Sequence, residues 1–139
     1  MSEPQRHHAT VAQARAHIPG PPAKNWPDGT PFATLLAHGT MSVEYYAPVG
    51  TDPQQPHEQD ELYFIDRGSG VFMLGDAELP FAPGDCLFVP AGVRHRFKSF
   101  SAGFGAWVVF WGPQGGEDGA VHERGQVRGD RPPSTGAAG

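Results

Sequence analysis

The sequence has almost no cysteine. Cys86 is its only one, and a lone thiol cannot form a disulfide within the chain. This excludes a small secreted domain stabilised by several disulfides, and it fits a reducing compartment. We interpret Cys86 as a small buried hydrophobic side chain rather than as a reactive thiol.

Clusters of basic residues and long apolar segments are also missing. The chain carries 10 Lys and Arg against 15 Asp and Glu, a formal net charge of −5. Because no basic block can neutralise phosphates, we expect no nucleic-acid partner and no membrane partner. No apolar run is long enough to span a bilayer, and the residues after Met1 lack the apolar core of a signal peptide. We therefore predict a cytoplasmic protein whose partner is a small molecule.

Glycine and proline are abundant, at 19 and 15 of 139 residues. Both favour turns and interrupt helices. Short segments with the composition of strands lie between them, at 32–37, 41–47, 62–65, 70–74, 79–81, 86–89, 94–100 and 106–111. No segment shows a long apolar repeat of 3.6 residues. About eight short strands separated by turns predict an all-β sandwich or barrel.

The length allows about one domain, and the composition divides it into three parts. Residues 1–30 are rich in Ala, His, Gln and Pro and form an arm, in which any short helix would end before Pro19. We expect residues 31–112 to form the barrel and residues 113–139 to form a flexible tail with few large apolar side chains. Because neither end offers much to a core, we expect the barrel to stay folded without residues 1 to about 25, or without everything beyond about Gly116.

The first chemical motif runs from Gly50 to Gly68. His57 and Glu61 flank the entry of a predicted strand, and six residues separate Glu61 from Gly68. This pattern resembles the first motif of the cupin superfamily, which reads Gly, five residues, His-x-His, three or four residues, Glu, six residues, Gly. With Glu61 aligned, His57 takes the place of the second His and Gln55 takes the place of the first. Gly50 is then one residue short of the usual spacing.

A second motif runs from Gly84 to His95. A predicted strand leads from Gly84 to a turn at Pro90 and Gly92, and His95 begins the returning strand. The pattern is similar to the second cupin motif, Gly, five residues, Pro-x-Gly, two residues, His, whereas the Asn that usually follows is Ser99. The resemblance covers about residues 34–111. It implies a small single-domain cupin with a double-stranded β-helix, also called a jelly-roll barrel.

The two motifs together suggest a metal site. Side chains on one face of a strand recur at every second residue, so Glu61 and Tyr63 share a face. Two imidazoles and one carboxylate with open positions suit Fe(II), and they also bind Mn, Zn, Ni or Cu. The resemblance implies one such divalent ion on His57, Glu61 and His95, with Gln55 as a fourth, weaker ligand.

Several of these residues also have plainer interpretations. Gln55 fits a loop amide bonded to backbone about as well as it fits a ligand, and Glu58 and Asp60 fit loop carboxylates that are solvated or face outward. The larger aromatic side chains fit a core better than a substrate cage, although a pocket above a metal would draw on them; they are Tyr63, Phe72, Phe97, Trp107 and Trp111.

Two functions fit the sequence, because a cupin fold does not fix an activity. The first is a metal-dependent enzyme, a dioxygenase, isomerase or lyase, that acts on a small organic molecule. Tyr63 would then be the catalytic residue that transfers protons, with Tyr45 and Glu44 as further candidates. The alternative is a non-catalytic module that binds or senses a small ligand and holds a structural metal. We also expect a homodimer, paired through residues 32–47 or the arm, since edge strands invite pairing.

Overall fold

The computed structural model describes residues 4–119, which form one short helix and eight strands. The helix is α1 (Val11–Ala16), and the strands are β1 (Phe32–His38), β2 (Met41–Tyr46), β3 (Asp60–Arg67), β4 (Gly70–Leu74), β5 (Ala77–Phe81), β6 (Cys86–Val89), β7 (His95–Phe100) and β8 (Gly105–Trp111). Each strand segment predicted from the sequence overlaps one of these strands. The all-β fold class is confirmed.

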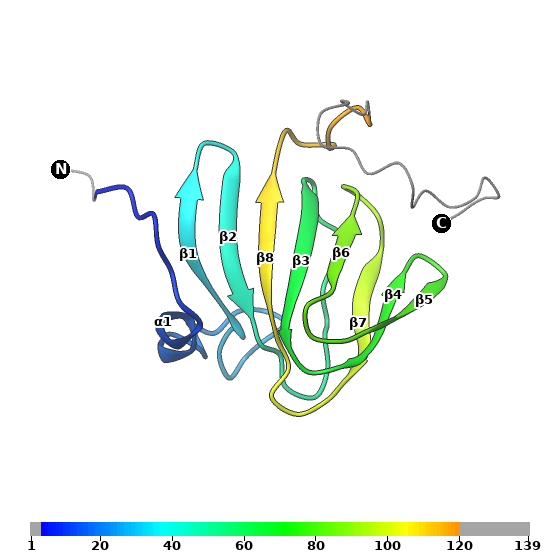
Figure 1. Ribbon diagram of the computed structural model, residues 1–139, viewed down its shortest axis with the longest axis horizontal. Helices are drawn as coiled ribbons and strands as arrows, with labels where there is room; N and C mark the ends of the chain where they lie inside the picture. The colour runs from blue at the N-terminus through cyan, green and yellow to red at the C-terminus, as the bar shows by residue number, and fades with distance from the viewer. Residues whose placement is uncertain (1–3, 120–139) are drawn as a thin grey trace.

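The strands form two antiparallel sheets that face each other (Figure 1). The larger sheet has the order β1-β2-β8-β3-β6, and the smaller one has the order β5-β4-β7. Consecutive strands such as β3 and β4, or β5 and β6, lie in different sheets, so the chain crosses between the sheets repeatedly. This is the arrangement of a jelly-roll barrel, as the two motifs implied.

The two sheets enclose an aromatic core. On β3 every second side chain points inward, so Glu61 and Tyr63 are 1% and 0% exposed, whereas Phe64 is 41% exposed. The ring of Tyr63 lies 5.6 Å from that of Phe72 on β4 and 5.0 Å from that of Phe97 on β7, measured between centroids. The inward face of β3 therefore carries the packed ring of Tyr63 and, two residues earlier, the buried carboxylate of Glu61. An apolar core offers that carboxylate no hydrogen-bond donor.

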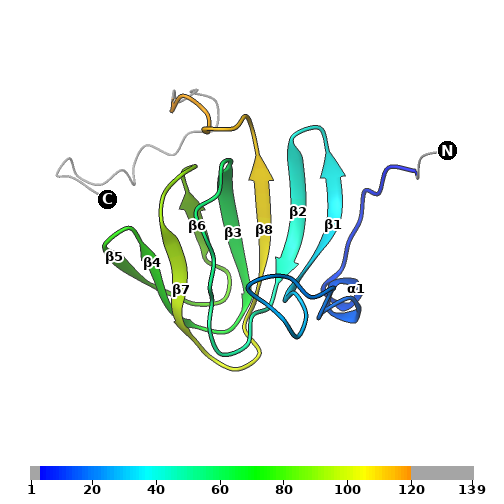
Figure 2. The same ribbon diagram turned by 180° about the vertical axis from the view of Figure 1, so that it is seen from behind.

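The N-terminal segment packs against the outside of the barrel, with α1 beside β1 and β2 (Figure 2). Thr10 begins the helix with a capping box. Ala14 is fully buried in a second apolar cluster, and Arg15 donates to the hydroxyl of Tyr45 at 3.2 Å. The expectation that the arm offers little to a core does not hold for this helix.

Removal of residues 1–17 is therefore expected to destabilise the barrel. The deletion exposes apolar surface of Leu35 and Tyr45 and removes the hydrogen bond from Arg15. Each Å² of newly exposed apolar surface lowers the free energy of unfolding by about 25 cal/mol. For a domain of this size, we expect the lost stability to lower the melting temperature by roughly 10 °C. Thermal melting followed by circular dichroism measures it. An unchanged melting temperature would restore the original expectation from the sequence.

Two other expectations can be compared with the structure. Cys86 is exposed rather than buried, because it occupies an outward position of β6. The predicted tail, 113–139, falls only partly within the described residues, and residues 120–139 lie outside them. In the described part, the backbone N–H of Gly115 donates to the carbonyl oxygen of Glu58 at 2.7 Å. The divisions at residues 30 and 112 stay predictions.

No helix within residues 4–119 is long and apolar enough to cross a membrane.

Candidate metal centre

Three side chains able to bind a metal ion converge between the two sheets. Glu61 lies on β3, His95 begins β7, and His57 lies in the loop that leads into β3. The Nε2 atom of His95 is 3.0 Å from Oε1 of Glu61, and Nε2 of His57 is 3.9 Å from Oε2 of Glu61. One potential ligand atom from each residue lies within 4.8 Å of the others. The predicted convergence of these three residues is confirmed.

The polar atoms at this point have unmet hydrogen-bonding capacity. Both carboxylate oxygens of Glu61 and Nε2 of His95 are buried, and none has a hydrogen-bond partner among residues 4–119. The short distance between His95 and Glu61 does not have the orientation of a hydrogen bond. Leaving such atoms unpaired costs about 1–3 kcal/mol each, and more for charged groups. A bound cation would satisfy all three atoms, so the donor set fits a divalent transition metal.

The surroundings of the two histidines differ. Nδ1 of His95 lies 2.9 Å from the carbonyl oxygen of Val93 and donates to it, which leaves the lone pair of Nε2 facing Glu61. Burial lowers the pKa of His57 and so favours the neutral, metal-binding form. Burial also acts to lower the pKa of His95, but the carboxylate of Glu61 outweighs it and the net pKa is raised. A cation at Glu61 would take the place of that proton.

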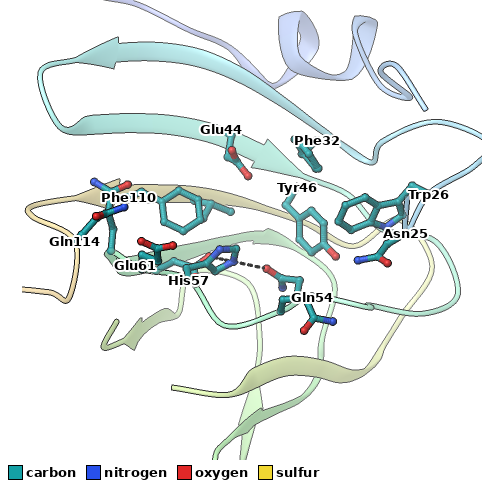
Figure 3. Close-up of a pocket in the computed structure, with 14 residues that line it drawn as sticks. Asn25, Trp26, Phe32, Glu44, Tyr46, Gln54, His57, Glu61, Phe110 and Gln114 are labelled. Atoms are coloured by element: carbon teal, nitrogen blue, oxygen red, sulfur yellow. Dashed lines mark hydrogen bonds and ion pairs between the residues drawn. The ribbon is translucent and has the colours of Figure 1, made fainter. Parts of the chain in front are cut away.

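The sequence analysis missed an amide beside these residues. Oε1 of Gln54 lies 3.3 Å from Nε2 of His57 (Figure 3). The same oxygen accepts from the hydroxyl of Tyr63 at 3.1 Å. Its Nε2 donates to Oδ2 of the buried Asp52 at 2.9 Å. Gln55 is exposed, and its role as a fourth ligand stays a prediction. The motif spacing pointed to Gln55, because spacing does not encode how an irregular loop directs each side chain.

Tyr63 is enclosed by aromatic rings and fully buried. Burial raises the pKa of its phenol well above the ordinary value, and the charge of Glu61 raises it further. A phenol that holds its proton so firmly is a poor acid–base catalyst. Its catalytic role stays a prediction, and its hydrogen bond to Gln54 supports a positioning role instead.

Asp60 is not solvated, although it lies on the opposite face of β3 from the inward Glu61 and so faces outward as one of the two interpretations had it. Asp60 is 6% exposed. Its Oδ1 accepts from the backbone N–H of Ala91 at 3.0 Å, and its Oδ2 accepts from that of Glu117 at 3.0 Å. Asp60 thereby ties the residue next to Glu61 to the Pro-x-Gly turn of the second motif, and so helps to hold the two motifs together.

A cavity of about 540 Å³ opens beside the metal-binding residues (Figure 3). Its volume lies within the range of roughly 300–1,000 Å³ of small-molecule sites. The lining combines polar groups with aromatic rings, and includes His57, Glu61, Glu44, Trp26, Phe32, Tyr46 and Phe110. Trp26 belongs to the arm that the sequence analysis placed outside the barrel, where a lone Trp gave no signal of a binding role.

Glu44 projects into this cavity from β2 (Figure 3). Burial, and after it the charge of Glu61, raises the pKa of Glu44 to about 7. A carboxyl group with such a pKa can both donate and accept a proton near neutral pH. Tyr45, the neighbouring candidate from the sequence, points to the opposite face of β2, where its hydroxyl donates to Asp66 at 2.6 Å.

Comparison with known proteins agrees with this geometry. A family model described as "Cupin domain" matches residues 42–110, which include His57, Glu61 and His95. The chain belongs to the cupin superfamily. An uncharacterized protein of Streptomyces coelicolor is 39% identical to this cupin over 85 residues, which are 60% of this chain and 81% of that protein.

Two enzymes are also similar to this cupin. The acireductone dioxygenase of Leishmania braziliensis is 41% identical over 51 residues, 33% of this chain and 15% of the enzyme. The dimethylsulfoniopropionate lyase DddQ of Ruegeria pomeroyi is 31% identical over 87 residues, 61% of this chain and 42% of the lyase. This cupin thus spans less than half the length of either enzyme.

Solved structures share the fold. BH2720 from Bacillus halodurans matches with a TM-score of 0.55 and 17% identity, over 61% of this cupin and 72% of that chain. KdgF from a Halomonas species matches with a TM-score of 0.52 and 13% identity, over 58% and 76% respectively. At these identities the likeness shows the fold alone.

Proposed function

We propose that this cupin is a metal-dependent enzyme that acts on a small organic molecule. The observation that carries the proposal is the set of buried, unpartnered atoms of Glu61 and His95, next to His57 and beside a cavity of about 540 Å³. Structural metal sites are usually closed by four protein ligands, whereas catalytic sites keep a position open for a substrate. Three ligands beside a cavity match the catalytic pattern, and a fourth protein ligand would still leave two positions open around an octahedral ion.

The ion would be one divalent transition metal, Fe, Zn, Mn, Ni or Cu, held by His57, Glu61 and His95. Such an ion supplies Lewis acidity or O₂ activation when it is bound. The cavity wall adds aromatic surface at Trp26 and Phe32, which meet edge to face at 5.5 Å between ring centroids. A substrate with an oxygen-bearing polar group and an apolar body would complement both kinds of surface.

Glu44 would carry the proton transfer. Its carboxyl group faces the same cavity as the metal-binding residues, and its pKa of about 7 suits a group that takes a proton from a substrate and returns it. A non-catalytic module has no need of such a group, so Glu44 favours the enzyme. The similarity to a dioxygenase and to a lyase supports dioxygenase-like or lyase-like chemistry, with isomerase-like chemistry as a third class.

Turnover by metal-loaded protein tests this proposal. The protein is loaded in turn with Fe(II), Zn, Mn, Ni and Cu. O₂ consumption is followed with catechols, β-diketones and thiols, and isomerisation or elimination of hydroxy acids and sugars is followed by NMR. We expect turnover with at least one metal. Ligand binding without turnover under every metal would favour the alternative, a non-catalytic binding or sensing module with a structural metal.

We also propose that the chain forms a homodimer in the cytoplasm. β1 is the last strand of the larger sheet, and its outer edge pairs with no other strand within residues 4–119. Unpaired backbone groups on such an edge favour pairing with a second chain. Light scattering at micromolar concentration should give twice the mass of one chain, and the mass of a monomer would contradict the proposal.

A further inference from the structure

We propose that the amide oxygen of Gln54, held in direction by Asp52, is the fourth protein ligand of the metal. The inference rests on the proposed metal site and concerns which glutamine of the pair completes it. Gln55 occupies the motif position, but it is exposed, and no hydrogen bond of its side chain is found within residues 4–119. Gln54 instead contacts both His57 and Tyr63.

The direction of the Gln54 amide is fixed by its neighbours. Its Nε2 donates to Oδ2 of Asp52 at 2.9 Å, and a flipped amide would set its oxygen against that carboxylate. Asp52 is itself held in place, because it accepts from the hydroxyl of Tyr46 and from the backbone N–H of Phe97, the latter at 2.7 Å. The amide oxygen of Gln54 must therefore be the atom that faces His57 and Tyr63.

The separation of Gln54 and His57 fits two ligands of one ion. Ligand atoms about 2.0–2.2 Å from a metal lie about 2.8–3.1 Å from their neighbours in octahedral sites and about 3.3–3.6 Å apart in tetrahedral sites. Oε1 of Gln54 lies 3.3 Å from Nε2 of His57. If His57 binds the ion through Nε2, that atom carries no proton and cannot donate to Gln54. Two lone pairs would then face each other, an arrangement that a cation between them makes favourable.

Tyr63 leaves this oxygen free to bind the ion. A carbonyl oxygen has two lone pairs, and the hydroxyl of Tyr63 occupies one of them at 3.1 Å. The second is available to a cation. Tyr63 and Asp52 thus orient the Gln54 amide from both ends, as outer hydrogen bonds commonly do for metal ligands. This arrangement also accounts for the buried phenol of Tyr63, which lies among aromatic rings and donates to Gln54.

The test is titration with Co²⁺ alone, followed by its visible absorption bands, on the full chain and on matched variants. We expect Gln54→Ala to weaken Co²⁺ binding about 10- to 100-fold and to shift the bands, because an oxygen donor is lost. Gln55→Ala is the adjacent control. It should leave the Co²⁺ affinity within about threefold of the wild type and the absorption bands unshifted. Gln54→Asn keeps an amide but withdraws its oxygen, so it should behave like Gln54→Ala.

Two further measurements separate the possible failures. Circular dichroism of each metal-free variant shows whether it folds. If Gln54→Ala fails to fold, the Co²⁺ titration of Gln54→Asn provides the test instead. His95→Ala should lose Co²⁺ altogether. If His95→Ala loses Co²⁺ while the Gln54 variants bind as Gln55→Ala does, the Gln54 ligand is refuted and the metal site stands. If His95→Ala retains Co²⁺ with an unchanged spectrum, the metal site itself is refuted, and the Gln54 ligand with it.

Discussion

Replacement of His95 by alanine is expected to abolish stoichiometric metal binding. Nε2 of His95 is buried beside Glu61 at 3.0 Å, and the carbonyl of Val93 fixes the tautomer that leaves this nitrogen free to bind. Loss of a principal ligand should cost more than the 10- to 100-fold typical of an outer hydrogen bond, about 1,000-fold or more. Elemental analysis after dialysis against a weak chelator measures the metal that remains.

A matched control comes from the same chain. His38 is an exposed histidine at the end of β1 and lies outside the site, so His38→Ala should keep the full metal content. Full occupancy in His95→Ala would show that the metal, if bound, is bound elsewhere. Loss in both variants would point to a general effect on the fold, which thermal melting of the metal-free proteins would reveal.

Glu44→Gln is expected to change the pH dependence of stability in the metal-free protein. Burial raises the pKa of Glu44 to about 7 from 4.5. The folded state therefore holds this proton more tightly than the unfolded chain does. The contribution of this tighter proton binding to the free energy of unfolding is fully present below about pH 4.5 and is lost as the pH rises through about 7. Glutamine does not ionise and loses no such stability. The free energy of unfolding of the variant, relative to that of the wild type, should therefore rise by up to about 3 kcal/mol as the pH increases from about 5 to 8.5.

Urea unfolding at these two pH values measures the difference. Equal pH dependence in the two proteins would show that Glu44 ionises as it would in water. The same substitution also tests the chemistry once a substrate is known. Removal of a general acid–base group lowers turnover by about 10²- to 10⁴-fold, and we expect this loss with the metal content unchanged. Unchanged turnover would remove Glu44 from the mechanism.

Much of the fold and the centre of the site could be predicted from local rules. Alternation along β3 sets Glu61 inward beside Tyr63, and the turn at Pro90 and Gly92 returns the chain so that His95 begins β7. Two short motifs were enough because Glu61 and His95 lie at the starts of β3 and β7, where the backbone path is regular, and His57 lies only four residues before Glu61. The glycine and proline residues located the strands but not all of their ends, since β3 runs from residue 60 to 67 and the predicted segment was 62–65.

The remaining site residues depend on contacts that spacing does not encode. Gln54 rather than Gln55 reaches His57 because Asp52 anchors the loop to Phe97, which lies 45 residues further along the chain. Asp60 appears solvated in the sequence, and its partners come from the turn and from the segment after β8. Trp26 lies at the cavity beside Phe32, the first residue of β1, against which its ring packs. Each of these depends on the irregular path of a loop.

Crystallography with anomalous diffraction at the absorption edge of the bound metal tests the central claim most directly. The account predicts one anomalous peak, within about 2.0–2.3 Å of a nitrogen of His57, a nitrogen of His95 and an oxygen of Glu61. A metal-loaded crystal with no peak at these three residues, and with Glu61 and His95 paired only with each other or with water, would contradict it.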